Sequence, residues 1–199
     1  MDASQETLCD EKRESVKIQT LRDRWFTKYA NILNGVPLEL PLLREINHQI
    51  PLIDDSKRYY YHLPHCPDTM KPQLMEKMKQ YVGAGWWIPK AVPQVAPLLC
   101  IPKKLGKLRT VVDCQQHNNN TVKDITPFPD QDQIRMDVAQ AKFCSKIDLS
   151  NTYKQVHIEP EDVHKTAFVT VYGTCKSNIL QQGDCNGSAT FQWLMTAIF

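Results

Sequence analysis

The sequence lacks the features that would place this 199-residue chain in a membrane or on an export route. No apolar run approaches the roughly 20 residues that a helix needs to cross a bilayer. Residues 1–14 are polar and of mixed charge, without the apolar core of a signal peptide. We therefore expect an intracellular protein, cytoplasmic or nuclear, which is not secreted and has no membrane partner.

Cysteine pairs at metal-binding spacing are also missing. The seven cysteines are odd in number, and no two of them form Cys-x-x-Cys. Free thiols in a reducing compartment fit this pattern better than a disulfide framework or a zinc site. Internal repeats and low-complexity tracts are absent too. The hydrophobic share of 42% is enough for a buried core, so global disorder is excluded.

The small net charge of +2 hides a local excess of positive charge. Residues 61–125 carry nine basic and four acidic side chains, an excess of five, and the rest of the chain is close to neutral or acidic. A basic surface attracts phosphate, although most charged segments are simply solvated. Charge alone therefore permits a nucleic-acid partner without establishing one.

Three segments follow one another along the chain. Residues 1–34 are a polar lead-in with a helical stretch near Val16–Leu33, and residues 35–67 are rich in proline and tyrosine, which predicts an extended lead-in. Residues 68–199 carry the alternating patterns of an α+β fold. There we expect a helix after Asp68 or Thr69 that ends at Gly83 or Gly85, strands at 97–102 and 108–113, a helix at 130–140, strands at 143–149, 155–158 and 166–172, and a helix at 188–199.

Two clusters stand out as candidate sites, and each has a structural alternative. Asp148 ends an apolar strand, where it would bind a hard cation or cap the next turn; spacing alone favours the cap. The hairpin tip carries Lys103, Lys104, Lys107 and Arg109, which would clamp phosphates or protect a sheet edge, with neither favoured.

A third candidate precedes the final helix. Gln181-Gln182-Gly183 and Asn186-Gly187-Ser188 lie at the start of that helix. Small residues there allow close backbone approach, and a helix N-terminus favours anions. Taken alone, this pattern is better explained as an ordinary capped turn.

In this order, the motifs together resemble the reverse transcriptases of gypsy-type retrotransposons. The run Pro102–Asp113 looks like their fingers hairpin, and Asn118–Asp124 follows it as in those elements. Ala141–Leu149 with Tyr153 and Gln155 is similar to the first acidic motif of the palm. Lys165–Phe168 and the stretch from Gly183 to Gln192 match later palm motifs. The resemblance covers roughly residues 35–199 and implies a right-hand polymerase fold.

The resemblance also implies roles for particular residues. Asp148 would be the catalytic carboxylate and Mg²⁺ ligand of a two-metal nucleotidyl transfer. Lys107 and Gly183 would contact the template, which makes an RNA or DNA template-primer and deoxynucleotides the expected partners. The incoming nucleotide would be held by Lys103, Lys104, Arg109, Leu149, Tyr153 and Gln182, with Tyr153 excluding a 2′ hydroxyl.

The chain also departs from the family pattern. It contains no aromatic-x-Asp-Asp run and ends where that motif should follow, so we expect fingers and a partial palm without a thumb. One carboxylate cannot hold two Mg²⁺ ions, so we expect the chain to be inactive by itself unless missing polymerase segments complete it. The alternatives are a non-catalytic nucleic-acid binder and a degenerate remnant without a role. Polar substitutions mark the drift: Gln115, His117, Thr152, Gln181, Asp184 and Ser188.

Overall fold

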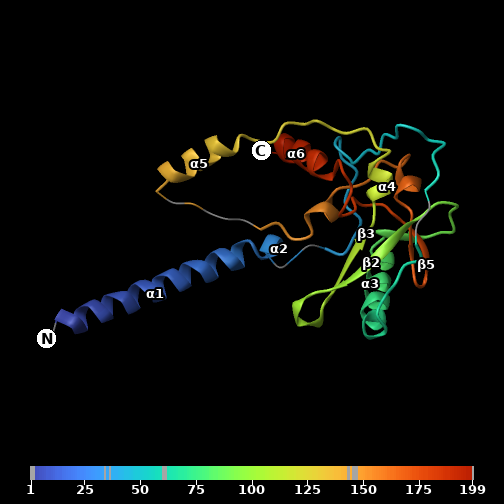
Figure 1. Ribbon diagram of the computed structural model, residues 1–199. Helices are drawn as coiled ribbons and strands as arrows, with labels where there is room; N and C mark the ends of the chain where they lie inside the picture. Colours follow the sequence, from blue (N-terminus) through green and yellow to red (C-terminus); the bar gives the residue numbers. More distant parts are fainter. Residues whose placement is uncertain are drawn as a thin grey trace. The chain divides into compact units, whose positions relative to one another are not determined.

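The computed structural model describes residues 3–33, 35, 37–59, 62–142, 144 and 148–198 (Figure 1). The chain divides into two compact units, Met1–Pro37 and Leu38–Phe199. The first unit contains α1 (Ala3–Lys28) and α2 (Ala30–Leu33). The helix expected near Val16–Leu33 is therefore confirmed, and it begins earlier than the apolar pattern indicates. None of the described helices is both long and apolar enough to span a bilayer.

A five-stranded sheet is the centre of the second unit. Its order is β1-β5-β4-β2-β3, with β2 and β4 parallel and the other neighbours antiparallel. The expected hairpin is confirmed, since Leu98 pairs with Val112 and Pro102 with Leu108. The strands are β1 (Trp87–Pro89), β2 (Ala96–Pro102), β3 (Leu108–Val112), β4 (Phe168–Thr170) and β5 (Gly173–Ser177).

Helix α3 (Lys71–Gly83) contributes to the main core together with the sheet. Its expected apolar face is confirmed, because Leu74 and Tyr81 are buried with Trp86 at the centre of the cluster. The expected side-chain cap is wrong. The helix begins after a 3₁₀ turn (Asp68–Met70), where Met70 makes no side-chain cap and Asp68 instead pairs with Lys71 at 2.6 Å.

A smaller core lies under α6 (Gly187–Ile198), where Leu194 packs with Val156, Ile158 and Leu180. The strand expected at 155–158 is wrong. A 3₁₀ turn (Thr152–Gln155) occupies its beginning, and His157 and Ile158 form only isolated bridges. The extended lead-in runs beside this segment, where His48 forms an isolated bridge with Ile158. The His48 N–H donates to the His157 carbonyl, so this backbone group is satisfied without a continuous strand.

The remaining α-helices of the described residues are α4 (Gln115–Asn118) and α5 (Gln131–Gln140), and 3₁₀ turns lie at Lys104–Gly106 and Val163–Thr166. The helix expected at 130–140 is confirmed, and Asp130 caps it by accepting from two backbone N–H groups. The strand expected at 143–149 lies partly outside the described residues, which omit 143 and 145–147. At its end Leu149 is 51% exposed and belongs to no strand, so the prediction of a buried strand end is wrong.

Candidate functional site

A cavity of about 700 Å³ opens between the hairpin, α3 and the segment that leads into α6. The hairpin contributes Lys103 and Arg109, and α3 contributes Lys77 and Tyr81. The 3₁₀ turn before Val156 and the segment after β5 complete the wall. Their lining residues include Asn151, Thr152, Tyr153, Lys154, Gln181 and Gln182.

Four of the predicted site residues line this one cavity: Lys103, Arg109, Tyr153 and Gln182. They come from three parts of the chain that lie far apart in the sequence, so their convergence results from the fold. The other predicted residues do not line it: Lys104, Lys107, Asp148, Leu149 and Gly183.

Gln73 of α3 holds the hairpin tip in place. Its side-chain amide donates to the Gly106 carbonyl at 2.9 Å and accepts from the Leu108 amide at 2.9 Å. The turn closes through Lys103 N–H to Lys107 O at 2.8 Å. Lys103, Lys104 and Lys107 are therefore exposed on a turn that has a fixed backbone.

Tyr153 stands against the start of α6. Its hydroxyl lies 3.2 Å from Ser188 Oγ, and its ring makes an edge contact with Phe191. A side chain at Gly187 would come within 3.5 Å of the same ring. Ser188, one of the departures from the family pattern, thus supplies a hydroxyl that orients the tyrosine at the cavity wall.

The surroundings of position 183 require a glycine there. It has φ +118°, and a Cβ there would lie 3.2 Å from the Val112 carbonyl of β3. Asn118 fixes the same turn, because Nδ2 donates to Gly183 O at 2.8 Å and Oδ1 accepts from Cys185 N–H at 3.0 Å. The close approach predicted for this glycine is therefore made to the neighbouring strand, and template contact stays a prediction.

Lys77 and Lys154 belong to the cavity, and sequence reasoning missed both. Lys154 donates to the Tyr81 hydroxyl and to Asn151 Oδ1, and burial followed by the charge of Lys77 lowers its pKa to about 8. Burial and then the charge of Lys103 lower the pKa of Lys77. The helical pattern carries one signal for Lys77, which lies three residues after Leu74 and four before Tyr81.

The charges around this cavity are all of one sign. None of the described residues that line it is an aspartate or glutamate. We call it the cationic cavity after the four cationic side chains that line it: Lys77, Lys103, Arg109 and Lys154. Burial, and after it the charge of a neighbouring lysine, lowers the pKa of both Lys77 and Lys154. A concave site with this charge attracts anions and holds them at reduced dielectric.

Asp148 does not complete a metal site in this arrangement. It is exposed and does not line the cationic cavity, so its role as a metal ligand stays a prediction. Among the described residues, no group of three or more histidine, cysteine or acidic side chains could hold a metal ion. One exposed carboxylate does not fit two Mg²⁺ ions, so no catalytic step through them follows from these residues.

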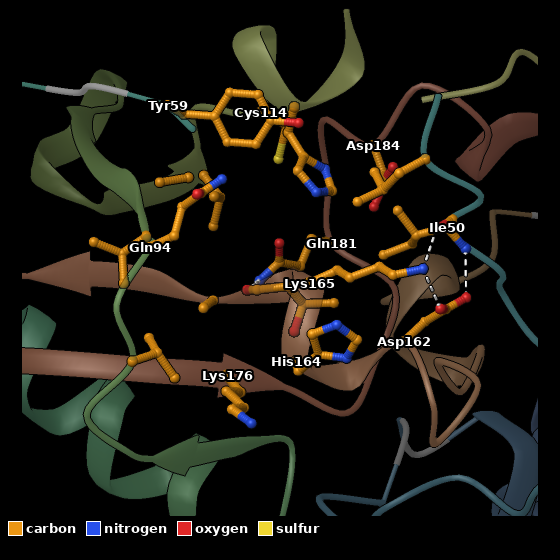
Figure 2. A pocket seen from close by; sticks show the side chains of 18 of the residues that line it. Ile50, Tyr59, Gln94, Cys114, Asp162, His164, Lys165, Lys176, Gln181 and Asp184 are labelled. Atoms are coloured by element: carbon orange, nitrogen blue, oxygen red, sulfur yellow. Dashed lines mark hydrogen bonds and ion pairs between the residues drawn. The ribbon is translucent and has the colours of Figure 1, made fainter. Parts of the chain in front are cut away.

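A second cavity, of about 720 Å³, lies beside the lead-in and the turn before β4 (Figure 2). Lys165 crosses it, pairing with Asp162 at 2.7 Å and donating to the Ile50 carbonyl at 2.8 Å. His117, Gln181 and Asp184 line it, three of the departures noted above. Asp184 thus faces this second cavity and does not line the cationic cavity.

Comparison with known proteins adds a family and relatives to this geometry. Residues 101–199 match the family described as "Reverse transcriptase (RNA-dependent DNA polymerase)". The chain is similar to the retrovirus-related Pol polyprotein from transposon opus of Drosophila melanogaster, with 29% identity over 83% of this chain and 17% of the relative. The Tf2-3 transposon polyprotein of Schizosaccharomyces pombe is 26% identical over 86% of this chain and 12% of the relative. The chain thus spans less than a fifth of these curated relatives.

Solved structures show the same fold. The native crystal structure of prototype foamy virus protease-reverse transcriptase superposes with a TM-score of 0.72 at 22% identity, over 94% of this chain and 24% of the viral chain. A foamy viral protease-reverse transcriptase in complex with dsDNA gives 0.65 at 23% identity, over 78% and 31%. The α+β arrangement of hairpin, sheet and helices is therefore that of part of a polymerase.

Proposed function

Because this chain belongs to the reverse transcriptases of retrotransposon Pol polyproteins over residues 101–199, we propose that its cationic cavity binds the triphosphate of a deoxynucleotide. One observation supports this above all. Lys103, Arg109, Tyr153 and Gln182, each assigned to nucleotide binding from the sequence, line a cavity without a described acidic side chain. The gypsy-type assignment remains part of the proposal.

Each residue then has a chemical task. Arg109 offers a planar fork of donors to oxygens of two phosphates, and Lys103 acts as a mobile point charge. Tyr153, held by Ser188, would lie under the sugar and leave no space for a 2′ hydroxyl. Gln182, exposed at the cavity wall, would donate to the sugar.

The exposed tip of the hairpin is the proposed contact for a nucleic-acid backbone. Lys104 and Lys107 lie at this tip outside the cavity, which suits phosphates that pass across its mouth. We propose an RNA or DNA template-primer as this partner, with Gly183 near the template strand and Leu149 near the nucleotide. An intracellular site of action, in the cytoplasm or the nucleus, belongs to the same proposal.

Catalysis is a separate matter, because these 199 residues supply only Asp148 as a family carboxylate. We propose that the chain binds its ligands without extending a primer unless a further segment completes the carboxylate set. A primer-extension assay with Mg²⁺ or Mn²⁺ checks this, with no template-dependent product expected. Synthesis that Asp148→Ala abolishes would overturn the proposal of inactivity and confirm Asp148 as catalytic.

Binding is tested with a fluorescent RNA–DNA template-primer and anisotropy at rising salt. Affinity should fall steeply with salt, since each phosphate contact releases counterions. Lys104→Ala with Lys107→Ala should weaken binding on any sequence and flatten the salt slope. The matched control is Lys79→Ala with Arg135→Ala, two exposed cations outside the cavity. Salt-independent binding, or equal losses in both double variants, would count against the proposed interface.

A second candidate function is non-catalytic binding of nucleic acid. The observation in its favour is that Asp148 is exposed and is not among the residues that line the cationic cavity. This candidate predicts the same salt-dependent binding of template-primer but no binding of a free deoxynucleoside triphosphate in the cationic cavity. Titration with a deoxynucleoside triphosphate therefore separates the two functions, and the template-primer binding assay does not.

A further inference from the structure

Two lysines that no family motif assigns meet at the inner wall of the cationic cavity. Both ammonium groups lie against one aromatic ring: Lys154 Nζ is 4.4 Å and Lys77 Nζ 5.7 Å from the Tyr81 ring centroid. Lys154 also lies 5.2 Å from the Trp86 ring, which is fully buried. Aromatic faces stabilise cations here, but they do not neutralise them.

The hydrogen bonds of these lysines leave capacity for a ligand. Lys154 gives two of its three protons to Tyr81 Oη and Asn151 Oδ1, and no other described residue accepts the third. Lys77 makes no hydrogen bond and no ion pair within the described residues. Ammonium groups in a partly buried wall without a counter-charge are costly, and a bound anion would offset that cost.

We propose that Lys77 and Lys154 form a second anion-binding element, separate from the hairpin cations. This element holds phosphate oxygens of the bound polyphosphate. This inference rests on the proposed nucleotide-binding function and adds two residues to that site. The cavity would then hold a triphosphate between cations from β3 and the hairpin turn and cations from α3 and the 3₁₀ turn. A single phosphate would engage fewer of these cations and bind more weakly.

The charge balance of the cavity supports a ligand with several negative charges. Lys77 is coupled electrostatically to Lys103 on one side and to Lys154 on the other. These three ammonium groups therefore repel one another, and all of them line the same cavity as Arg109. A triphosphate carries enough charge to stabilise all of them together, whereas a carboxylate ligand would not.

The test uses inorganic triphosphate, which has no base and no sugar, and measures its binding to the full 199-residue chain by calorimetry. We expect Lys77→Gln and Lys154→Gln each to weaken binding by at least about tenfold, the loss of one charge-assisted hydrogen bond. Lys79→Gln, which removes an exposed cation from the same helix, should leave binding unchanged. A thermal melt of each variant shows that it is folded.

The outcomes separate this inference from the proposed function. Unchanged binding of triphosphate and deoxynucleotide by folded Lys77→Gln and Lys154→Gln would overturn the inference and leave nucleotide binding intact. Lysine-dependent binding of inorganic triphosphate without binding of deoxynucleotide or template-primer would support the anion site and overturn the proposed function. Binding of inorganic phosphate as tight as that of triphosphate would contradict a polyphosphate ligand. If Lys154→Gln fails to fold, Lys154→Arg, which keeps the charge, should preserve binding.

Discussion

His48 and Asp184 meet inside the second unit, with His48 Nε2 3.3 Å from Asp184 Oδ2. The two side chains are 0% and 4% exposed, and they come from the extended lead-in and from the turn before α6. The other ring nitrogen, His48 Nδ1, lies 2.8 Å from Thr190 Oγ1 of α6. A polar chain thus links the lead-in to the helix, and it contains one of the polar departures from the family pattern.

Asp184→Ala should destabilise the protein by about 1–3 kcal/mol, because it leaves the buried imidazole of His48 without its acidic partner. Urea unfolding followed by tryptophan fluorescence measures this as a lower midpoint with an unchanged m-value. The control is Asp132→Ala, which breaks an exposed pair with Arg135 and should cost no more than about 0.5 kcal/mol. Equal effects of the two variants would show that the buried pair is not stabilising.

Gly183→Ala should lower the free energy of unfolding more than Gly83→Ala does. The positive φ strains any L side chain, and the new Cβ would lie 3.2 Å from the Val112 carbonyl, so a loss of about 1–3 kcal/mol is expected. Gly83→Ala is the opposite case, since a Cβ there meets nothing within 4 Å. That variant should be neutral or stabilising, by up to about 1 kcal/mol. The same urea experiment ranks the two, and the reverse order would contradict the described turn.

Gln73→Ala should loosen the hairpin tip without unfolding the sheet. It removes two hydrogen bonds, one of them from the Leu108 amide. We expect hydrogen exchange at that amide to accelerate by roughly two- to tenfold, as for loss of about 0.5–1.5 kcal/mol. The Thr110 amide, farther along β3, serves as an internal reference and should change less. Uniform acceleration along β3 would instead indicate that the whole strand depends on Gln73.

Lys154 should make stability depend on pH in a defined direction. Its pKa is about 8 in the folded chain against an ordinary 10.5, so the unfolded chain binds more protons between these values. Its contribution therefore destabilises the fold below pH 8 and is relieved as pH rises toward 10. Buried thiols such as Cys114, whose pKa burial raises, act in the opposite direction over this range. The prediction thus concerns the difference between the unchanged chain and Lys154→Met.

That difference in the free energy of unfolding should favour the variant at pH 7 and shrink steadily up to pH 9.5. Urea unfolding in the presence of a reductant at half-unit intervals gives the curve. Lys79→Met, an exposed lysine on α3, should show no such trend. A difference that is flat with pH would show that Lys154 titrates normally.

Local patterns predicted the elements that depend on local chemistry. The hairpin at 97–113 follows from two β-rich runs around a glycine-bearing turn, and α3 from its apolar period. The strand predicted at 155–158 failed because Val156 and Ile158 are buried by the lead-in and α6 rather than by strand neighbours. Alternating apolar residues indicate that a segment is buried, but they do not identify the element that buries it.

The sequence predicted only those residues of the candidate site that belong to family motifs. Lys103, Arg109, Tyr153 and Gln182 carry family patterns, and the fold brings them together. Lys77 and Lys154 carry none, and they became visible through their position around Tyr81. The lowered pKa of Lys154 depends on its burial and then on the charge of Lys77, which no single-sequence pattern encodes.

Calorimetric titration of the 199-residue chain with a deoxynucleoside triphosphate tests the proposed nucleotide site itself. We expect measurable binding, and Lys103→Ala with Arg109→Ala should weaken it by at least about tenfold, as expected for lost charge-assisted contacts. The charge-matched control, Lys79→Ala with Arg135→Ala, should bind as tightly as the unchanged chain. Equal binding by all three folded proteins, or none by any of them, would contradict a nucleotide site in this cavity.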